Sequence, residues 1–291
     1  NALLPDVIAM TITVIRDTVV CLDENNNPLR DIILWLDKRT VDPNGAMPAK
    51  NMMVFKLAGM EPTAKVVYAA SAGNWIMRHE PEIWARTSKY VMLPTYLNYK
   101  LTGNLIDSAS NQIGHIPFDY KNRRWMKPGS LTRCFCDVPN EKLCDLVPSG
   151  TVIGTITEEV CALTGIPAGL PLISTGSDKG CETLGLAVVD SDKASISLGT
   201  TATIQFSTTE YVEPQQFLPA YPGVLNDHYN PEIEIYRGLW LLSWFVKEFG
   251  TADSIDAKEM GMAPEALLDA RIRDLPAGSD GLLLQPYWTA G

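Results

Sequence analysis

Histidines, paired cysteine motifs and long apolar runs are scarce or missing in this sequence. It contains only 3 His, and its 6 Cys are scattered without a C-x-x-C pair. Scattered cysteines in a chain of 291 residues are typical of reduced thiols, so we expect a cytoplasmic protein. Cys134, Cys136 and Cys144 lie close in sequence, but without a nearby histidine they favour ordinary thiols over a metal site. We therefore assign no metal ligand.

Positive charge is also limited. The chain has 24 Lys and Arg against 34 Asp and Glu, which gives a net charge of −10. This balance argues against nucleic acid or an anionic membrane as a partner, although a local basic site could still bind an anionic substrate. No apolar run is long enough to span a bilayer, and there are no internal repeats or low-complexity segments. The composition is otherwise ordinary for a globular protein.

Both ends of the sequence interrupt regular patterns. The chain starts at Asn1 and is apolar by Val7, and it stops shortly after the strand-like Gly281–Gln285. We therefore expect this sequence to be part of a longer protein. At this length more than one domain is expected.

The stretch Pro171–Gln205 organises the rest of the chain. A short apolar strand at Leu172–Ser174 leads through small polar residues to Asp178, at the start of a helix expected over Lys179–Val188. A strand at Ala194–Leu198 then ends in a Gly-Thr-Thr turn before the next strand. The N–H groups and hydroxyls of that turn could hold an oxyanion such as phosphate, and Asp178 could serve as a base. The residues of the turn are Gly199, Thr200 and Thr201.

Elsewhere, alternating and helical patterns predict a mixture of strands and helices. The early strands are so close together that they favour an antiparallel meander. The tryptophans Trp240 and Trp244, at i and i+4, are expected in the core. The predicted strands are Asp6–Thr13, Val19–Leu22, Asp31–Leu36, Gly150–Thr157, Ile233–Tyr236 and Gly281–Gln285, and the predicted helices are Val66–Arg78, Pro81–Arg86, Pro94–Leu101, Thr157–Thr164, Arg237–Phe249 and Ala263–Arg271.

Several charged residues allow two interpretations. Arg16 and Asp17 form either a solvated hairpin tip or a pair that grips hydroxyl groups, with the guanidinium donating and the carboxylate accepting. Trp35 is either a core residue or an apolar platform for a ligand. Asp37 is either a solvated charge or a group that binds hydroxyls beside that platform. Spacing alone favours the structural interpretation in both cases. Asp107 is interpreted as a helix N-cap.

Several segments in order resemble the FGGY family of carbohydrate kinases, which includes relatives of glycerol kinase and xylulokinase. ITVIRDTVVCLD is similar to a segment with an Arg-Glu pair, and LRDIILWLDKRT is similar to a Trp-x-Asp-x-Arg segment. LPTYLNYKLTGNLIDSASNQ, TGSDKGCETLGLAV followed by SLGTTATI, and PAGSDGLLLQPYWTAG resemble later family segments. The resemblance extends from near Val7 to Gly291.

The resemblance implies an α/β fold made of ribonuclease-H-like domains of the actin and hexokinase superfamily, each with a mixed sheet flanked by helices. It implies ATP-dependent phosphorylation of a hydroxyl on a small sugar or polyol, with Mg²⁺ as cofactor. Asp178 would be the general base. Arg16, Asp17, Trp35 and Asp37 would bind substrate together with Asp178. Gly199, Thr200 and Thr201 would hold the transferred phosphate.

In this comparison residues 1–207 form the N-terminal domain without its first strand, and residues 208–291 form a linker and the start of the nucleotide-binding domain. We expect little activity from this part alone, and the oligomeric state is compatible with a homodimer or homotetramer. Arg16 and Asp17 favour glycerol-like polyols, whereas Trp35 and Asp37 favour pentuloses, so the substrate stays open. The alternative is a non-catalytic sugar-binding or regulatory protein that has kept the fold.

Overall fold

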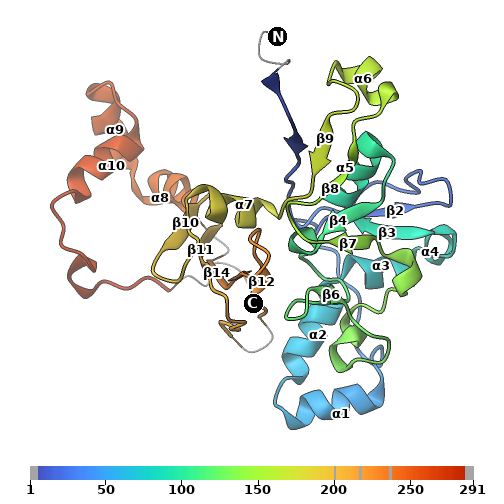
Figure 1. Ribbon diagram of the computed structural model, residues 1–291. Coiled ribbons are helices and arrows are strands. Elements are labelled where there is room, and N and C mark those ends of the chain that lie inside the picture. The colour runs from blue at the N-terminus through green and yellow to red at the C-terminus, as the bar shows by residue number, and fades with distance from the viewer. Residues whose placement is uncertain (1–5, 200, 216–217, 236–237, 286–291) are drawn as a thin grey trace. The chain divides into compact units, whose positions relative to one another are not determined.

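A computed structural model of the chain describes residues 6–199, 201–215, 218–235 and 238–285. The chain divides into two compact units, which are described separately below (Figure 1). The first contains Asn1–Ser191 and Ser207–Pro231, and the second contains Asp192–Phe206 and Glu232–Gly291. Ser207–Pro231 thus belongs with the N-terminal residues. The domain boundary expected at residue 207 of the whole protein stays a prediction.

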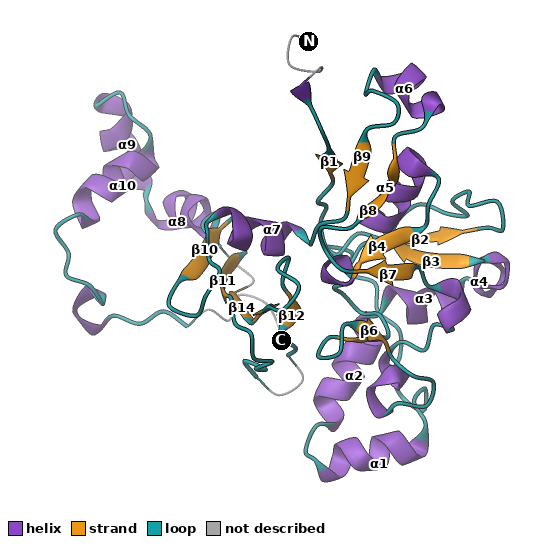
Figure 2. Cartoon of the chain, in the orientation of Figure 1, coloured by secondary structure: helices purple, strands orange, loops and turns teal. Residues whose placement is uncertain are grey.

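In the first unit, the strand that precedes the expected base lies beside the start of the chain. Strand β1 (Met10–Thr11) pairs in parallel with β9 (Pro171–Ile173), and β9 pairs antiparallel with β8 (Val152–Thr155). Both views show β1 running alongside β9 (Figures 1 and 2). This pairing brings the segment after β1 to the carboxyl end of β9.

Other short strands pair around this sheet. Strand β2 (Val19–Leu22) is antiparallel to β3 (Lys89–Met92), and β4 (Ile106–Ser108) is parallel to β7 (Asp145–Val147). The hairpin strands β5 and β6 and the pair β12 and β13 complete the unit. Their bounds are Phe118–Asp119, Arg124–Trp125, Tyr221–Pro222 and Tyr229–Asn230.

Several helix ends of the first unit have a local chemical cause. Proline occupies the first turn of several of them, where its missing N–H has no helical partner to lose. Gly103 and Gly165 end two helices with positive φ angles of 80° and 76°. The helices are α1 (Ala49–Leu57), α2 (Glu61–Ala70), α3 (Ala72–His79), α4 (Pro81–Arg86), α5 (Leu93–Thr102), α6 (Glu158–Thr164) and α7 (Asp178–Gly185), with 3₁₀ turns at Ala109–Asn111, Leu131–Phe135 and Asn140–Lys142.

The core of the first unit surrounds β2, whose four residues are all buried. Val19 and Cys21 pack on one side with Ile76, Phe118 and other apolar residues. On the other side, Val20 and Leu22 pack with Val91 and Cys144. A strand buried on both faces fits its uninterrupted apolar sequence. The aromatic Phe118 is part of this core.

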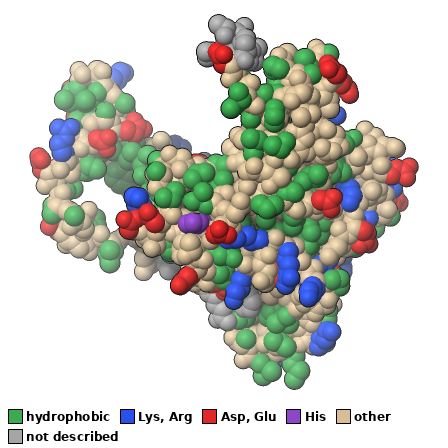
Figure 3. Space-filling view, viewed as in Figure 1, with side chains coloured by type: hydrophobic (Ala, Val, Ile, Leu, Met, Phe, Trp, Pro, Cys, Tyr) green, Lys and Arg blue, Asp and Glu red, His purple; other side chains and the backbone are tan. Residues whose placement is uncertain are grey.

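The second unit contains an antiparallel sheet and a group of helices. Strands β10 (Ala194–Leu198), β11 (Ala202–Phe206) and β14 (Glu232–Ile235) pair in the order β10-β11-β14. Helix α8 (Leu241–Phe249) is followed by α9 (Thr251–Glu259), α10 (Pro264–Ile272) and a 3₁₀ turn at Ser279–Gly281. Hydrophobic side chains lie on the surface of these helices (Figure 3).

Several predictions about local structure are wrong. Asp6–Thr13 forms a strand only at Met10–Thr11, and it pairs with β9 rather than in a meander with β2. Asp31–Leu36 contributes a single antiparallel bridge, between Ile33 and Val19. The expected helix Val66–Arg78 is two helices separated at Ser71, whose hydroxyl accepts a hydrogen bond from the Asn74 N–H and so begins α3.

In the second unit the differences come from missing burial. Trp240 and Trp244 are 45% and 37% exposed rather than in a core, because the described residues of this unit do not bury that side of α8. In the segment expected as a strand at Gly281–Gln285, Gly281 belongs to the 3₁₀ turn Ser279–Gly281, and the following residues pair with no other described segment. Tyr236 and Arg237 lie outside the described residues.

No helix among the residues that the structure describes is long and apolar enough to cross a membrane.

Candidate functional site

The candidate site is built on the elbow that joins β9 to α7. The chain leaves β9 at Ile173 and passes through small polar residues to Ser177, the N-cap of α7. The Ser177 hydroxyl accepts a hydrogen bond from the Gly180 N–H at 3.3 Å, which satisfies one donor of the first helical turn. Asp178 is therefore the first residue of the helix, where the helix dipole favours a negative charge.

Hydrogen bonds from distant segments fix the elbow in place. The Thr13 hydroxyl donates to the Gly176 carbonyl at 2.9 Å, and the Ser177 N–H donates to the Ser110 carbonyl at 3.1 Å. The Ser108 hydroxyl donates to the Thr175 carbonyl. These contacts attach the elbow to the segment after β1 and to the end of β4.

Gly176 allows this close approach. A Cβ at this position would lie 2.7 Å from Cγ2 of Val224 and 3.3 Å from Cβ of Ser110. Both distances are shorter than an ordinary carbon contact, so a side chain at position 176 would push the elbow away from its supports.

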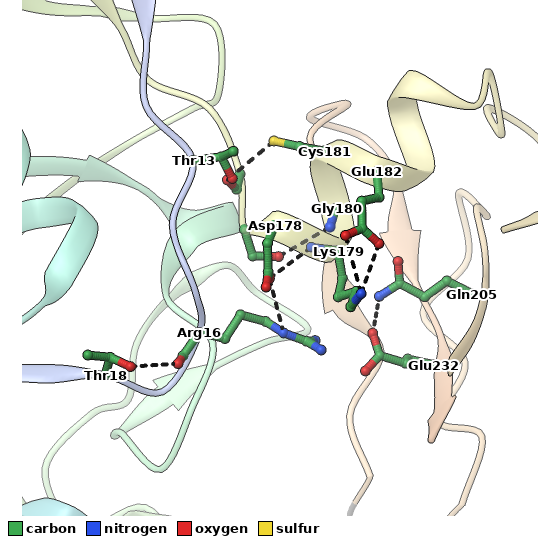
Figure 4. A network of polar contacts seen from close by, with 12 residues as sticks. Thr13, Arg16, Thr18, Asp178, Lys179, Gly180, Cys181, Glu182, Gln205 and Glu232 are labelled. Carbon is green, nitrogen blue, oxygen red and sulfur yellow. Dashed lines mark hydrogen bonds and ion pairs between the residues drawn. The ribbon is translucent and has the colours of Figure 1, made fainter. Parts of the chain in front are cut away.

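The Asp178 carboxylate is partly exposed and held from one side. Its Oδ1 accepts the Lys179 N–H at 2.8 Å and lies 3.6 Å from the Arg16 Nε (Figure 4). Within the described part of the chain, no hydrogen bond or ion pair reaches its other oxygen, Oδ2. The side chain is 31% exposed. This leaves one oxygen able to accept a proton from an incoming hydroxyl.

Arg16 connects this carboxylate to the rest of the site. Its guanidinium lies 5.3 Å from the centre of the Tyr221 ring, and its side chain is 17% exposed. The Lys179 ammonium points away along the helix surface to Glu182, at 2.9 Å (Figure 4). Arg16 is thus the cation paired with Asp178, and Lys179 neutralises a different carboxylate.

Asp17 makes its contacts with His115. Its Oδ1 accepts the His115 backbone N–H at 2.9 Å, and its Oδ2 lies 2.6 Å from the His115 ring Nδ1. Burial opposes ionisation of both groups, but their hydrogen bond and mutual attraction are stronger, so the pKa of Asp17 is lowered and the pKa of His115 is raised. These shifts favour an ionised Asp17 beside a protonated His115.

The backbone around this ion pair is unusual. Asp17 has a φ angle of 46°, in the left-handed region that few residues other than glycine and asparagine adopt. Gly114 lies against it, and a Cβ there would come within 2.4 Å of the Asp17 Oδ1. Tyr120 holds Gly114, since its hydroxyl donates to the Gly114 carbonyl at 2.9 Å and accepts the Gly114 N–H at 3.1 Å.

Among the described residues, neither Trp35 nor Asp37 makes a hydrogen bond or ion pair with Asp178. Asp37 accepts two side-chain hydrogen bonds from Arg39, both at 2.8 Å, and these lower the pKa of Asp37. The Arg39 guanidinium in turn lies 4.4 Å from the centre of the Trp75 ring. Trp35 is 39% exposed. The role of Trp35 and Asp37 in binding substrate stays a prediction.

The expected phosphate turn lies in the second unit, at the hairpin between β10 and β11. The Gly199 N–H donates to the Thr201 carbonyl at 3.0 Å, so this donor is already used inside the turn. Gly238 packs closely against the same turn, where a Cβ would clash with the Gly199 and Thr201 backbone. Thr200 lies outside the described residues. Phosphate binding by Gly199, Thr200 and Thr201 stays a prediction.

Asp107 is part of the support for the site rather than a helix N-cap. It lies in β4, is fully buried, and accepts hydrogen bonds from Thr95, Ser108, Asn111 and Gln112. Burial raises its pKa to about 6, against the opposing effect of these bonds. The N-cap interpretation is wrong because the 3₁₀ turn at Ala109–Asn111 starts from Ser108, without a side-chain cap.

Sequence reasoning missed His115 and the polar residues that hold the elbow. His115 lies 98 positions from Asp17, so no local pattern joins them. Thr13, Ser108 and Ser110 are ordinary loop and strand residues in the sequence. One feature of the sequence could have indicated this support. The run Asp107–Gln112 contains more hydrogen-bonding side chains than is usual for a half-buried strand or helix.

Magnesium has no assigned ligand here. Among the described residues, no group of three His, Cys, Asp or Glu side chains lies close enough to hold a metal ion. The Mg²⁺ requirement stays a prediction.

The fold and the elbow together describe an α/β protein in which a carboxylate, that of Asp178, lies at the start of a helix. A sequence model of the N-terminal domain of the FGGY family of carbohydrate kinases matches residues 2–185. The chain belongs to this family. The predicted family is thereby confirmed.

Individual relatives agree with this assignment. The chain is 32% identical over 194 residues to an uncharacterised sugar kinase of Escherichia coli (strain K12), covering 66% of this chain and 39% of that protein. It is 25% identical over 281 residues to a xylulose kinase of Lactococcus lactis, covering 93% and 51%.

Among solved structures, the gluconate kinase of Lactobacillus acidophilus matches with a TM-score of 0.74 at 21% identity, covering 96% of this chain and 55% of that one. This likeness confirms the predicted α/β fold. The chain spans about half the length of these proteins or less.

Proposed function

We propose that the protein containing this chain transfers a phosphate group from ATP to a hydroxyl of a small sugar or polyol, with Asp178 as the general base. The observation that carries the proposal is the Asp178 carboxylate. It is fixed through Oδ1 by the Lys179 N–H and by Arg16, and its Oδ2 has no hydrogen bond or ion pair within the described residues. Family membership supports the reaction class.

To act as the general base in phosphate transfer, the Asp178 carboxylate needs little more than the right position and a negative charge. A hydroxyl that lies within hydrogen-bonding distance of Oδ2 would pass its proton to Asp178 as the oxygen attacks the phosphate. Arg16 keeps the carboxylate in one orientation, and the start of α7 favours its negative charge. The support from Thr13 and Ser110 limits movement of the elbow during this step.

The test is a kinase assay on the intact protein that carries this chain. ATP is offered with polyols, ketoses and aldonates, and ADP release is measured. We expect turnover of at least one compound. Asp178→Asn keeps the size of the side chain and should lower kcat by about 10²- to 10⁴-fold, the usual contribution of a general base, with little change in KM.

A matched control is Glu182→Gln, which removes another carboxylate from the same helix. Glu182 pairs with Lys179 on the surface, so this variant should keep its kcat. Turnover of no compound in the panel would contradict the proposed function. Unchanged turnover by Asp178→Asn would contradict only the role of Asp178.

A further inference from the structure

The His115 ring has one nitrogen that the protein holds and one that it leaves open. Nδ1 lies 2.6 Å from the Asp17 Oδ2. For the other nitrogen, Nε2, no hydrogen bond or ion pair exists within the part of the chain that the structure describes. The side chain is 34% exposed, so this nitrogen can be reached from outside.

Asp17, by contrast, has both of its carboxylate oxygens occupied. Oδ1 accepts the His115 N–H and Oδ2 faces the ring. A carboxylate engaged in this way has less capacity to accept hydrogen bonds from a ligand. Sequence reasoning assigned a substrate contact to Asp17. Because both oxygens of Asp17 are engaged, the His115 ring becomes the candidate for that contact.

The ring also lies in the same group of charged side chains as Asp178. Arg16 and Asp17 are consecutive, so their Cα atoms are about 3.8 Å apart. The first contacts Asp178 and the second contacts His115. All of these residues belong to the first compact unit. The His115 ring and the Asp178 carboxylate are thus joined through the contacts of two consecutive residues.

We infer that His115 is a substrate-binding residue whose Nε2–H donates a hydrogen bond to an oxygen of the substrate, while Asp17 positions the ring. The inference rests on the proposed function, because it concerns the same substrate. Nδ1 can only donate to the Asp17 carboxylate if it carries a proton, and the raised pKa of His115 favours the form in which both nitrogens donate.

The partner of this nitrogen is an acceptor oxygen, which sugars supply as hydroxyls and aldonates as a carboxylate. A positively charged ring binds a carboxylate more strongly than a neutral hydroxyl. The experiment therefore uses both a ketose and an aldonate, and the compound that loses more affinity in the variants identifies the group that the ring contacts.

Two substitutions separate the two functions of the ring. Asn at position 115 can place its amide nitrogen near the position of Nδ1, which keeps the donor to Asp17 and removes Nε2. Gln is longer and can place a donor near Nε2. In the intact protein, His115→Asn should raise KM by about 10- to 100-fold with kcat little changed, as expected for one lost hydrogen bond of a charged group. His115→Gln should recover part of this loss.

His79→Asn serves as the control substitution. His79 stacks on Trp75, with ring centres 4.8 Å apart, and lies on helix α3 outside the site. This variant should keep its KM. If His115→Asn also keeps the KM of the unsubstituted protein, His115 only supports Asp17 and the inference is wrong.

A second measurement does not need catalysis. The ring nitrogen resonances of His115 are followed by NMR while the same ketose and aldonate are added without nucleotide, and the Nε2 resonance should shift. If this resonance shifts but no compound is phosphorylated, the proposed function fails and the inference stands. If compounds are phosphorylated and neither the resonance nor the KM of His115→Asn changes, only the inference fails. If there is neither phosphorylation nor a shift, both fail.

Discussion

Replacement of Gly114 by alanine tests whether the Asp17–His115 pair is as tightly packed as the structure shows. The new Cβ would lie 2.4 Å from the Asp17 Oδ1 and 2.9 Å from the Asp17 Cα. Backbone atoms cannot move away as a flexible side chain can, so the pair must shift. Overpacking of this kind usually costs about 1–3 kcal/mol.

A second cost comes from the backbone of Gly114. Its φ angle is 154°, at the edge of the region that L residues rarely adopt. Strain of this type costs on the order of 1–3 kcal/mol. Together the two effects predict that Gly114→Ala lowers the free energy of unfolding by about 2–6 kcal/mol, because the alanine can relieve neither without moving Asp17.

The measurement is urea unfolding followed by tryptophan fluorescence, with Gly129→Ala as the matched control. Gly129 also has a positive φ angle, 79°, but a Cβ there would meet no atom within 4 Å. This control should lose only about 1–2 kcal/mol from backbone strain. Equal losses in the two variants would refute the contact between Gly114 and Asp17 as the cause.

Three further predictions concern other parts of the first unit. Because burial raises the pKa of Asp107 to about 6, from about 3.9 when unfolded, its ionisation destabilises the fold as pH rises through this range. The stability of the unsubstituted protein relative to Asp107→Asn should therefore fall by about 2 kcal/mol between pH 4 and pH 7 in urea titrations. A difference that does not vary with pH would show that Asp107 is not buried in this way. Gly176→Ala, whose Cβ would lie 2.7 Å from Val224, should lower kcat by at least about 10-fold in the intact protein, because small displacements of a reacting group lower the reaction rate strongly. An unchanged kcat would mean that the elbow tolerates movement. Thr157→Ala removes the side chain that accepts the Val160 N–H at 3.3 Å and should cost about 1 kcal/mol of stability without changing KM, as measured by thermal unfolding and kinetics.

Much of the site's local structure could be predicted because it depends on neighbouring residues. The strand before Gly176 and the helix that starts at Asp178 follow from a short apolar run, a polar turn and a serine cap. The cap of α6 by Thr157 was predictable for the same reason. The resemblance to the FGGY family also came from such segments, and the family match confirms it.

The failures occurred where burial or pairing depends on distant residues. Asp31–Leu36 is apolar, but only Ile33 of this segment is buried next to Val19, and the neighbouring apolar side chains are exposed. Asp107 has the residue type of a cap, yet four polar side chains or N–H groups around it make it a buried acceptor. Neither outcome can be read from a local pattern, because each depends on which segments pack together.

The sequence by itself determined the elements of the elbow and the position of Asp178 at the start of α7, since capping and strand patterns involve residues only a few positions apart. Tertiary structure alone decided what surrounds this carboxylate. Thr13 reaches Gly176 across 163 positions, and Asp17 meets His115 across 98. These contacts form only after β1 pairs with β9 and the intervening chain folds, so the identity of the residues around Asp178 depends on how the whole unit packs.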